Sequence, residues 1–255
     1  MKIYRFRHEG NPAYGVLRED SLFLVKGPIF GEFEVGAHSV PLGEVTLLPP
    51  CEPTKIVAVG VNYREHALER GRGLPEEPLL FLKPPSAVIG PNETILYPRM
   101  SKRVDYEGEL ALVIRKECRG LEDDAPVEDF ILGYTCFNDV TARDLQDKDV
   151  QFTRAKSFDT FAAIGPCLVT DLDPSDARIK TFLNGKLKQS STTKSLIFPV
   201  PFLVRFISRI MTLVPGDVIT TGTPAGIGPM QPGDKVDVQI EGIGALSNTV
   251  LKVWE

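Results

Sequence analysis

Residues 104–114 read VDYEGELALVI, an apolar stretch typical of a β-strand that nevertheless contains two closely spaced glutamates. Side chains alternate between the two faces of a strand, so Glu107 and Glu109 project from one face and Gly108 from the other. Adjacent carboxylates repel each other and tend to hold protons. Their placement therefore favours a cation between them. The alternative is that this face of the sheet is open to water.

A third carboxylate could join this pair. Asp139 ends a second apolar run, FILGYTCFNDVT (130–141), and lies 30 residues after Glu109, a separation that suits a neighbouring strand. Three oxygen donors, with water completing the shell, favour Mg²⁺ or Mn²⁺, with Ca²⁺ as an alternative, and suit zinc poorly. Such a cation suits a substrate that chelates it through two oxygens, for example a 2-oxo acid or its enol, and it stabilises a developing enolate.

Short β-type runs dominate the chain. Residues 1–50 contain three of them and predict a small N-terminal β-rich domain. A proline-rich segment then predicts a boundary near residue 50, with a second domain over residues 51–255. Asn184 and Gly185 occupy the positions of a type I′ turn and predict a hairpin. Strands outnumber helices and do not alternate with them, which indicates an α+β, β-rich fold.

Three segments predict helices. Residues 199–213 have apolar side chains at helical spacing and predict the longest helix, and residues 142–148 predict a shorter one. Residues 62–71 predict one or two turns, with Asn62 as a candidate N-cap. The polar segment that follows, 71–78, is rich in Gly and Pro and is typical of a mobile loop or lid.

Composition excludes several classes of protein. The 255 residues are 42% hydrophobic and 25% charged, and the net charge of −5 comes without the basic patch of a nucleic-acid binder. The most apolar run, residues 196–204, is short and broken by proline, unlike a membrane span. The N-terminus lacks the apolar core of a signal peptide, so we expect a cytoplasmic protein. The widely spaced cysteines predict buried free thiols rather than a zinc site or disulfides (Cys51, Cys118, Cys136 and Cys167).

His66 and Glu69 lie three residues apart in a predicted helix and so share one face. Glu69 could orient the imidazole, which makes His66 a candidate general base for a C–H proton or for a water. The adjoining lid-like loop favours this catalytic interpretation. The alternative is an exposed helix pair with no role.

A second polar set could contact a substrate. Arg143 and Gln146 follow Asp139 on a predicted helix, one turn apart, and Lys156 follows in a predicted loop. They could hold a carboxylate and an oxyanion. The loop TTGTPAGIG (220–228) offers backbone N–H groups and the Thr223 hydroxyl to an anion. The alternatives are ordinary surface charges and a simple glycine-rich turn.

Several motifs occur together in one order. They are NYREHALERG (62–71), LLFLKPPSAVIGP (79–91), VDYEGELALVI (104–114), GYTCFNDVTARDLQ (133–146), AKSFDTFAAIGP (155–166) and ITTGTPAGIG (219–228). From about residue 54 onward the chain thereby resembles the fumarylacetoacetate hydrolase family. Its short N-terminal part is similar to the compact bacterial branch, which includes 2-hydroxyhepta-2,4-diene-1,7-dioate isomerases, acylpyruvate hydrolases and oxaloacetate decarboxylases.

The resemblance implies a mixed β-roll, usually a homodimer, that acts on small 2-oxo or 2-hydroxy-enol carboxylic acids through a metal-chelated enolate. It implies Mg²⁺ or Mn²⁺ on the three carboxylates and a catalytic dyad of His66 and Glu69 on a lid. The positions that match catalytic or substrate-contacting residues are Lys156, Arg143, Gln146 and Thr223. We expect an isomerase of aromatic-compound degradation. The alternatives are an acylpyruvate or fumarylpyruvate C–C hydrolase, an oxaloacetate decarboxylase, or a dicarboxylate-binding protein without catalysis.

Overall fold

The computed structural model of the chain describes residues 1–69, 71 and 73–252. Strands dominate it, and the α-helices within this part are short: α1 Arg64–Glu69, α2 Arg143–Lys148, α3 Thr153–Lys156 and α4 Val200–Ile210. The predicted β-rich α+β class, the longest helix within 199–213 and the four buried free cysteines are confirmed. No helix in these described ranges is long and apolar enough to cross a membrane.

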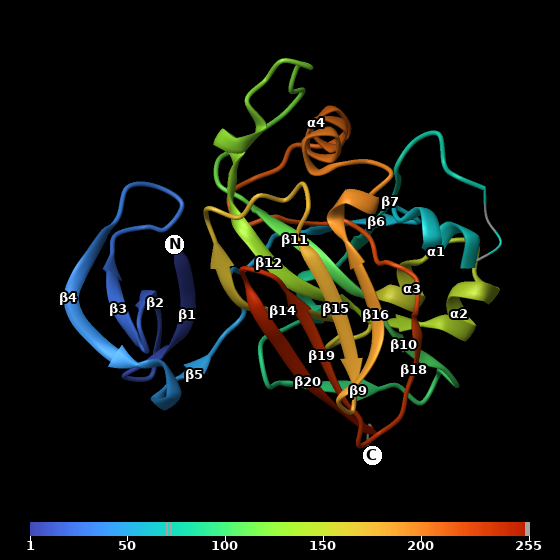
Figure 1. Ribbon diagram of the computed structural model, residues 1–255, viewed down its shortest axis with the longest axis horizontal. Helices are drawn as coiled ribbons and strands as arrows, with labels where there is room; N and C mark the ends of the chain where they lie inside the picture. The colour runs from blue at the N-terminus through green and yellow to red at the C-terminus, as the bar shows by residue number, and fades with distance from the viewer. Residues whose placement is uncertain (70, 72, 253–255) are drawn as a thin grey trace.

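The first four strands form an antiparallel meander, seen in blue at the left of Figure 1: β1 Lys2–His8, β2 Asn11–Arg18, β3 Ser21–Lys26 and β4 Glu34–Pro41. The first three match the predicted runs. Strand β1 also pairs with β14 Ala162–Val169, where Lys2 lies opposite Val169. The meander is therefore continuous with the main sheet. The domain boundary near residue 50 stays a prediction.

The main sheet has twelve strands, ten of them in the order β4-β3-β2-β1-β14-β12-β11-β17-β6-β7. Its other members are β5 Thr46–Leu47, β6 Ile56–Gly60, β7 Leu79–Lys83, β8 Val88–Ile89, β11 Gly108–Ile114, β12 Ile131–Asp139 and β17 Val218–Thr220. Strands β11 and β12 are antiparallel neighbours, and every residue of β11 is buried. Burial on both faces explains their nearly continuous apolar sequences.

Two smaller sheets complete the fold, in the orders β13-β10-β18 and β16-β15-β19-β20-β9. Their strands are β9 Thr94–Tyr97, β10 Val104–Tyr106, β13 Thr141–Ala142, β15 Arg178–Leu183, β16 Lys186–Thr192, β18 Gly228–Met230, β19 Lys235–Ile240 and β20 Gly244–Lys252. Single 3₁₀ turns are η1 Leu42–Glu44, η2 Pro85–Ala87, η3 Val127–Phe130 and η4 Thr193–Ser195.

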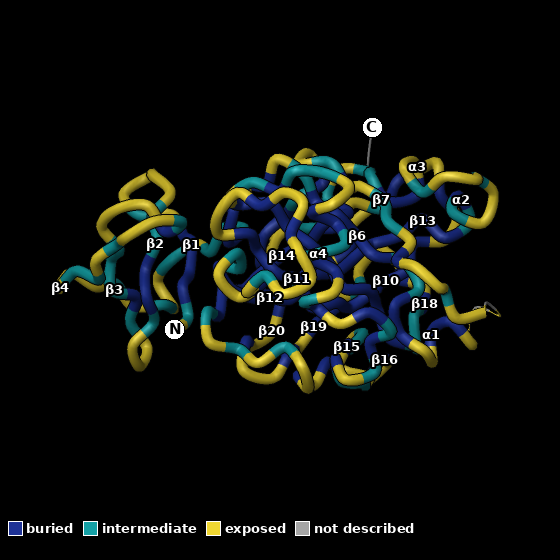
Figure 2. Tube along the Cα trace, turned by 90° about the horizontal axis from the view of Figure 1, so that it is seen from above, coloured by how far each residue is buried: buried dark blue, intermediate teal, exposed yellow. Residues whose placement is uncertain are grey.

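The five-stranded sheet lies against the main sheet, and apolar side chains from both form one hydrophobic core. Leu110 and Leu112 come from β11, and Val238 and Leu246 come from the smaller sheet. Figure 2 shows this buried core beneath a shell of exposed loops. The smaller sheet covers one face of β11 in the main sheet, and every residue of β11 is buried from water.

The stretch 104–114 is not the single strand that its sequence predicts. It divides at Glu107 into β10, which belongs to the three-stranded sheet, and β11, which belongs to the main sheet. The backbone N–H of Glu107 donates to the Asn138 side chain (2.9 Å), and its carbonyl accepts from the N–H of Asp139 (2.8 Å). This local pairing replaces the regular ladder and turns the chain from one sheet to the other.

The predicted one or two helical turns are present as helix α1, and residues 70 and 72 of the predicted helix and lid loop lie outside the described residues. Asn62 is not its N-cap. Its buried side chain bonds the backbone of Thr221 (2.8 Å) and of Phe198 (3.0 and 2.8 Å) instead. Asn62 therefore ties the chain before α1 to the strand end at β17 and to the segment before α4.

Two local predictions have opposite outcomes. The hairpin is confirmed, because β15 and β16 pair around Asn184 and Gly185, whose φ angles of 52° and 73° are those of a type I′ turn. The loop position of Lys156 is wrong, because Lys156 is the last residue of the short helix α3. Placing Lys156 on a helix turns its long side chain back into the protein.

Candidate metal and catalytic site

Three carboxylates converge at the N-terminal end of β11. Glu107 lies at the break before β11, Glu109 on β11, and Asp139 at the end of β12, and β11 and β12 pair directly with Gly108 opposite Asn138. Oxygen atoms from the three side chains lie within 4.8 Å of one another. All three residues are at most 5% exposed. The alternative interpretation of a solvated sheet face is therefore wrong.

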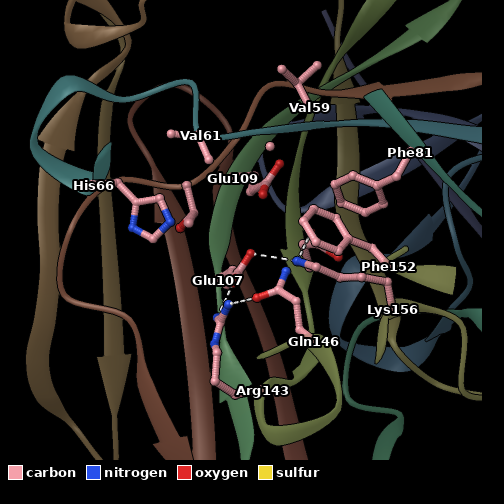
Figure 3. Close-up of a pocket in the computed structure, with 13 residues that line it drawn as sticks. Val59, Val61, His66, Phe81, Glu107, Glu109, Arg143, Gln146, Phe152 and Lys156 are labelled. Atoms are coloured by element: carbon pink, nitrogen blue, oxygen red, sulfur yellow. Dashed lines mark hydrogen bonds and ion pairs between the residues drawn. The ribbon is translucent and has the colours of Figure 1, made fainter. Parts of the chain in front are cut away.

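Two basic side chains, Arg143 and Lys156, lie beside Glu107 (Figure 3). Lys156 donates to Glu107 Oε2 at 2.8 Å and to Asp139 Oδ2, and Arg143 donates to Glu107 Oε1. Lys156 and Arg143 are each 2% exposed, so they are not ordinary surface charges. Both line the same pocket as the carboxylates.

Lys83 is a third basic residue at the site and is not among the residues predicted from the sequence. It ends strand β7, is 1% exposed, and donates to Asp139 Oδ1 and to the carbonyl of Val140 (3.3 Å). The available signal was a lysine at the end of an apolar run in LLFLKPP, where a buried strand rarely carries a charge. Lys83 and Lys156 together occupy both oxygens of Asp139.

Burial and neighbouring charges move the glutamate pKa values in opposite directions. For Glu107, burial raises the pKa, but Lys156 and Arg143 outweigh it and hold the pKa below its ordinary value. For Glu109, burial raises the pKa, and the carboxylates of Asp139 and Glu107 raise it further. The Oε2 of Glu109 accepts the N–H of Gly222 (2.8 Å), and no ion pair among the described residues includes Glu109. Glu109 therefore differs from Glu107, which Lys156 and Arg143 contact directly.

His66 and Glu69 form the expected pair. His66 Nδ1 lies 3.0 Å from Glu69 Oε2, and the other carboxylate oxygen accepts the N–H of Gly226 at 2.9 Å. His66 is 6% exposed and lines the pocket, so the alternative of an exposed pair fails for the imidazole. Among the described residues none forms a hydrogen bond with Nε2, so this nitrogen is available to a substrate.

Arg143 and Gln146 meet in the pocket, as their spacing on α2 predicts. Arg143 donates to Gln146 Oε1 and, through Nε, to Asp105 Oδ2 at 2.9 Å. Asp105 is fully buried and also accepts from Arg103 (2.9 and 3.2 Å). Asp105 thereby fixes the direction of the Arg143 guanidinium.

The Thr223 hydroxyl lines the pocket but already has two partners. It donates to the carbonyl of Gly108 (2.9 Å) and accepts from Gln189 Nε2 (2.8 Å). A hydroxyl has a single proton to donate, so a ligand at Thr223 would meet a remaining lone pair or the backbone. Its role as a substrate contact stays a prediction.

Two aromatic rings form the wall beside Lys156. Phe81 and Phe152 pack edge to face with ring centroids 5.5 Å apart, and Lys156 Nζ lies 5.1 Å from the centroid of Phe81. Figure 3 shows both rings next to the lysine. This wall lowers the local dielectric constant, which strengthens the charge interactions in the pocket.

The donor set fits a hard divalent cation. Its candidate ligands are oxygens of three buried carboxylates that lie within 4.8 Å of one another, the type of donor that such a cation prefers. Glu107, Glu109 and Asp139 are the residues that could hold Mg²⁺ or Mn²⁺. His66 and Lys156 line the same pocket and could reach a ligand of such a cation.

Comparison with known families and relatives gives consistent results. Residues 55–251 match the family described as fumarylacetoacetate (FAA) hydrolase, C-terminal, and residues 1–50 match the family described as Rv2993c-like, N-terminal. A protein of Archaeoglobus fulgidus is 54% identical over 239 residues, which is 91% of this chain and 95% of that protein. The oxaloacetate tautomerase YisK of Bacillus subtilis is 41% identical over 233 residues, 85% of this chain and 77% of that protein.

Solved structures share the whole fold. The 5-carboxymethyl-2-hydroxymuconate delta-isomerase of Mycobacterium smegmatis is 43% identical with a TM-score of 0.93, covering 99% of this chain and 100% of that one. The 2-hydroxyhepta-2,4-diene-1,7-dioate isomerase of Mycobacterium marinum is 41% identical with a TM-score of 0.92 and covers 100% of both. A maleylpyruvate hydrolase of Sphingobium sp. SYK-6, in complex with manganese(II) and pyruvate, is 27% identical with a TM-score of 0.83 and covers 100% of both. The chain belongs to the fumarylacetoacetate hydrolase family.

Proposed function

We propose that the protein is a Mg²⁺- or Mn²⁺-dependent isomerase that moves a proton in a 2-oxo or 2-hydroxy-enol carboxylic acid. The convergence of the three buried carboxylates with His66 and Lys156 in one pocket carries this proposal. A metal-binding protein without catalysis needs the carboxylates but has no need for a histidine held by a glutamate.

Glu107, Glu109 and Asp139 would hold the cation, which acts as a Lewis acid toward a substrate oxygen. The manganese and pyruvate bound in the related maleylpyruvate hydrolase support this choice of metal and of a 2-oxo acid. Ca²⁺ is the alternative hard cation.

The other pocket residues have distinct roles in the proposal. His66 moves a proton through Nε2 between the C2 oxygen and a carbon of the substrate, while Glu69 holds Nδ1. Lys156 and Gln146 donate to the oxygen that carries the negative charge of the enolate. Arg143, with Thr223, steadies a second carboxylate of the substrate.

Proton transfer without bond cleavage is the outcome we favour. The Mycobacterium smegmatis and Mycobacterium marinum structures, at 43% and 41% identity, are described as isomerases, and 2-hydroxyhepta-2,4-diene-1,7-dioate is the first candidate substrate. Oxaloacetate is the second, because the Bacillus subtilis relative is described as an oxaloacetate tautomerase. Both reactions move a proton between a substrate oxygen and a carbon. C–C hydrolysis and decarboxylation are the alternative reactions, and product analysis distinguishes them from isomerisation. The homodimeric state is a separate prediction, which sedimentation tests.

A substrate panel tests the proposal. The enzyme with Mn²⁺ is incubated in D₂O with 2-hydroxyhepta-2,4-dienedioate, oxaloacetate and an acylpyruvate, and products are identified by NMR and mass. We expect an isomer or tautomer that carries deuterium, no product in EDTA, and at least about a 100-fold lower rate for His66→Asn. Fragments from C–C cleavage as the main product would identify a hydrolase. Full turnover in EDTA would exclude the metal, and no turnover on any substrate would favour the binding protein.

A further inference from the structure

Tyr106 directly precedes Glu107 in the motif stretch, and the proposed reaction gives it no role. It is 2% exposed, and its hydroxyl donates to the carbonyl of Gly226 at 2.9 Å. The N–H of the same Gly226 donates to Glu69 at 2.9 Å. One glycine therefore connects the strand before the metal ligands to the carboxylate that holds His66.

Gly226 is held in place from a second side. Its φ of +98° favours glycine, and a Cβ there would lie 2.2 Å from the carbonyl oxygen of Lys188 on β16. The backbone of β16 thus presses directly against Gly226. Next to it, the Gln189 amide donates to the carbonyl of Pro224 (2.8 Å) and to Thr223. Residues 223–226 are therefore held on one side by contacts with β16. On the other side, the Tyr106 hydroxyl bonds the carbonyl of Gly226.

We propose that Tyr106 is a positioning residue for the proton-transfer pair: it fixes Gly226 so that the N–H of Gly226 orients Glu69, and Glu69 holds His66 at Nδ1. The consequence for catalysis rests on the proposed function. The structural consequence does not, because the position of the His66 ring can be measured without substrate.

The variant Tyr106→Phe removes one oxygen atom and keeps the ring. Tyr63→Phe is the matched control, because Tyr63 is fully buried and its hydroxyl has no hydrogen-bond partner in the described part of the chain. The imidazole ¹⁵N shifts are measured in the metal-free protein, where only His8, His38 and His66 contribute. We expect the Nδ1–H tautomer of His66 in the wild type and in Tyr63→Phe, and a mixture of tautomers in Tyr106→Phe. An unchanged His66 signal in a folded Tyr106→Phe protein would overturn the proposal.

Kinetics give the second readout, with whichever substrate the panel identifies. We expect Tyr106→Phe to lower kcat about 5- to 10-fold, the effect of one lost hydrogen bond, while Mn²⁺ affinity and KM stay near the wild-type values. In a Glu69→Gln background the same substitution should change kcat less than about twofold, because its target is already lost. If Tyr106→Phe lowers kcat by the same factor in the wild type and in Glu69→Gln, Tyr106 does not act through Glu69. If the wild type turns over no substrate, the proposed function fails while the ¹⁵N spectra still decide the role of Tyr106.

Discussion

At the scale of single residues, Asp139 lies between two buried ammonium groups. Lys83 of β7 contacts one of its oxygens and Lys156 of α3 the other. Lys156 lines the pocket and so can exchange its partner for a bound ligand, whereas Lys83 lies behind the carboxylate. Burial lowers the pKa of Lys83 more than the Asp139 charge raises it. The cost of burying the Lys83 charge is thus offset only in part, by Asp139, by Glu107 and by the carbonyl of Val140.

The substitution Lys83→Met tests this pairing. It leaves Asp139 buried with one cation fewer, and removing one partner of a buried ion pair costs about 3–5 kcal/mol in the free energy of unfolding. Urea unfolding of the metal-free protein measures the change. Lys116→Met is the control, because the Lys116–Asp129 pair is 3.8 Å apart and half exposed or more on both sides, and such pairs contribute at most about 1 kcal/mol. Equal losses in the two variants would show that Lys83 stabilises no more than a surface lysine.

Residue type and position in a strand predicted part of this site. Glu107, Glu109 and Asp139 each interrupt an apolar run, and a charge in such a run is a local signal. The sequence around Lys83 and Gln189 indicates their roles less clearly, because each role depends on a partner far away in the chain. Lys83 contacts Asp139, and Gln189 contacts Gly108. Lys83 lies 56 residues from Asp139 in the chain. A single sequence contains no measure of that proximity.

At the scale of elements, Gly108 is the point where β11 meets the hairpin of β15 and β16. Its N–H donates to Gln189 Oε1 (3.0 Å), and a Cβ at this position would lie 2.2 Å from Thr181 Oγ1. Gly108 also separates Glu107 and Glu109, two of the three candidate metal ligands. The absence of a side chain here lets the two layers touch directly beneath the carboxylates.

A rescue experiment follows from this contact. Gly108→Ala should force β11 away from the hairpin, costing about 1–3 kcal/mol of stability and weakening Mn²⁺ binding. Thr181→Ala removes the clashing oxygen, and the next atoms are 3.3 Å away, so the double variant should regain most of both losses. Thermal unfolding and calorimetric titration with Mn²⁺ measure them, with Thr181→Ala alone as the control. A double variant no better than Gly108→Ala would disprove direct contact as the cause.

Local rules predicted elements well where one segment decides the outcome. The type I′ turn at Asn184 and Gly185 needs only two residues, and the hairpin formed as expected. The division of 104–114 into β10 and β11 was missed, because it depends on Asn138 from another strand. The residue pattern of 104–114 is that of one continuous strand. The division at Glu107 becomes visible only in the structure, where the N–H of Glu107 donates to the Asn138 side chain.

At the scale of the whole molecule, strand composition predicted a β-rich fold but not how its sheets join. Strand β1 extends the main sheet by pairing with β14, about 160 residues further along the chain. Such long-range pairing leaves no periodic signal in either segment. The same assembly of distant strands buries the carboxylate trio, so the stability of the whole fold is coupled to the charge at the site.

Glu109 and Glu107 make the stability of the fold depend on pH in opposite directions. The folded pKa of Glu109 is raised above its unfolded value of about 4.3, so its contribution to stability is present below that value and is lost as pH rises through the folded pKa. The folded pKa of Glu107 is lowered, so its contribution is present above the unfolded value and is lost as pH falls. The metal-free protein should therefore lose stability through Glu109 as the solution approaches neutrality.

The neutral variant Glu109→Gln should be more stable than the wild type at pH 7 without metal, because it removes a buried negative charge beside two others. Mn²⁺ should reverse the order: at 100 times its Kd it stabilises the wild type by about 2.7 kcal/mol, and Glu109→Gln lacks the ligand that allows this. Thermal unfolding at pH 5 and pH 7, with and without Mn²⁺, measures both effects, and Glu122→Gln on the surface is the control. A metal-free Glu109→Gln protein less stable than the wild type at pH 7 would mean that Glu109 stabilises the fold by itself, and the case for a cation between the carboxylates would lose its electrostatic basis.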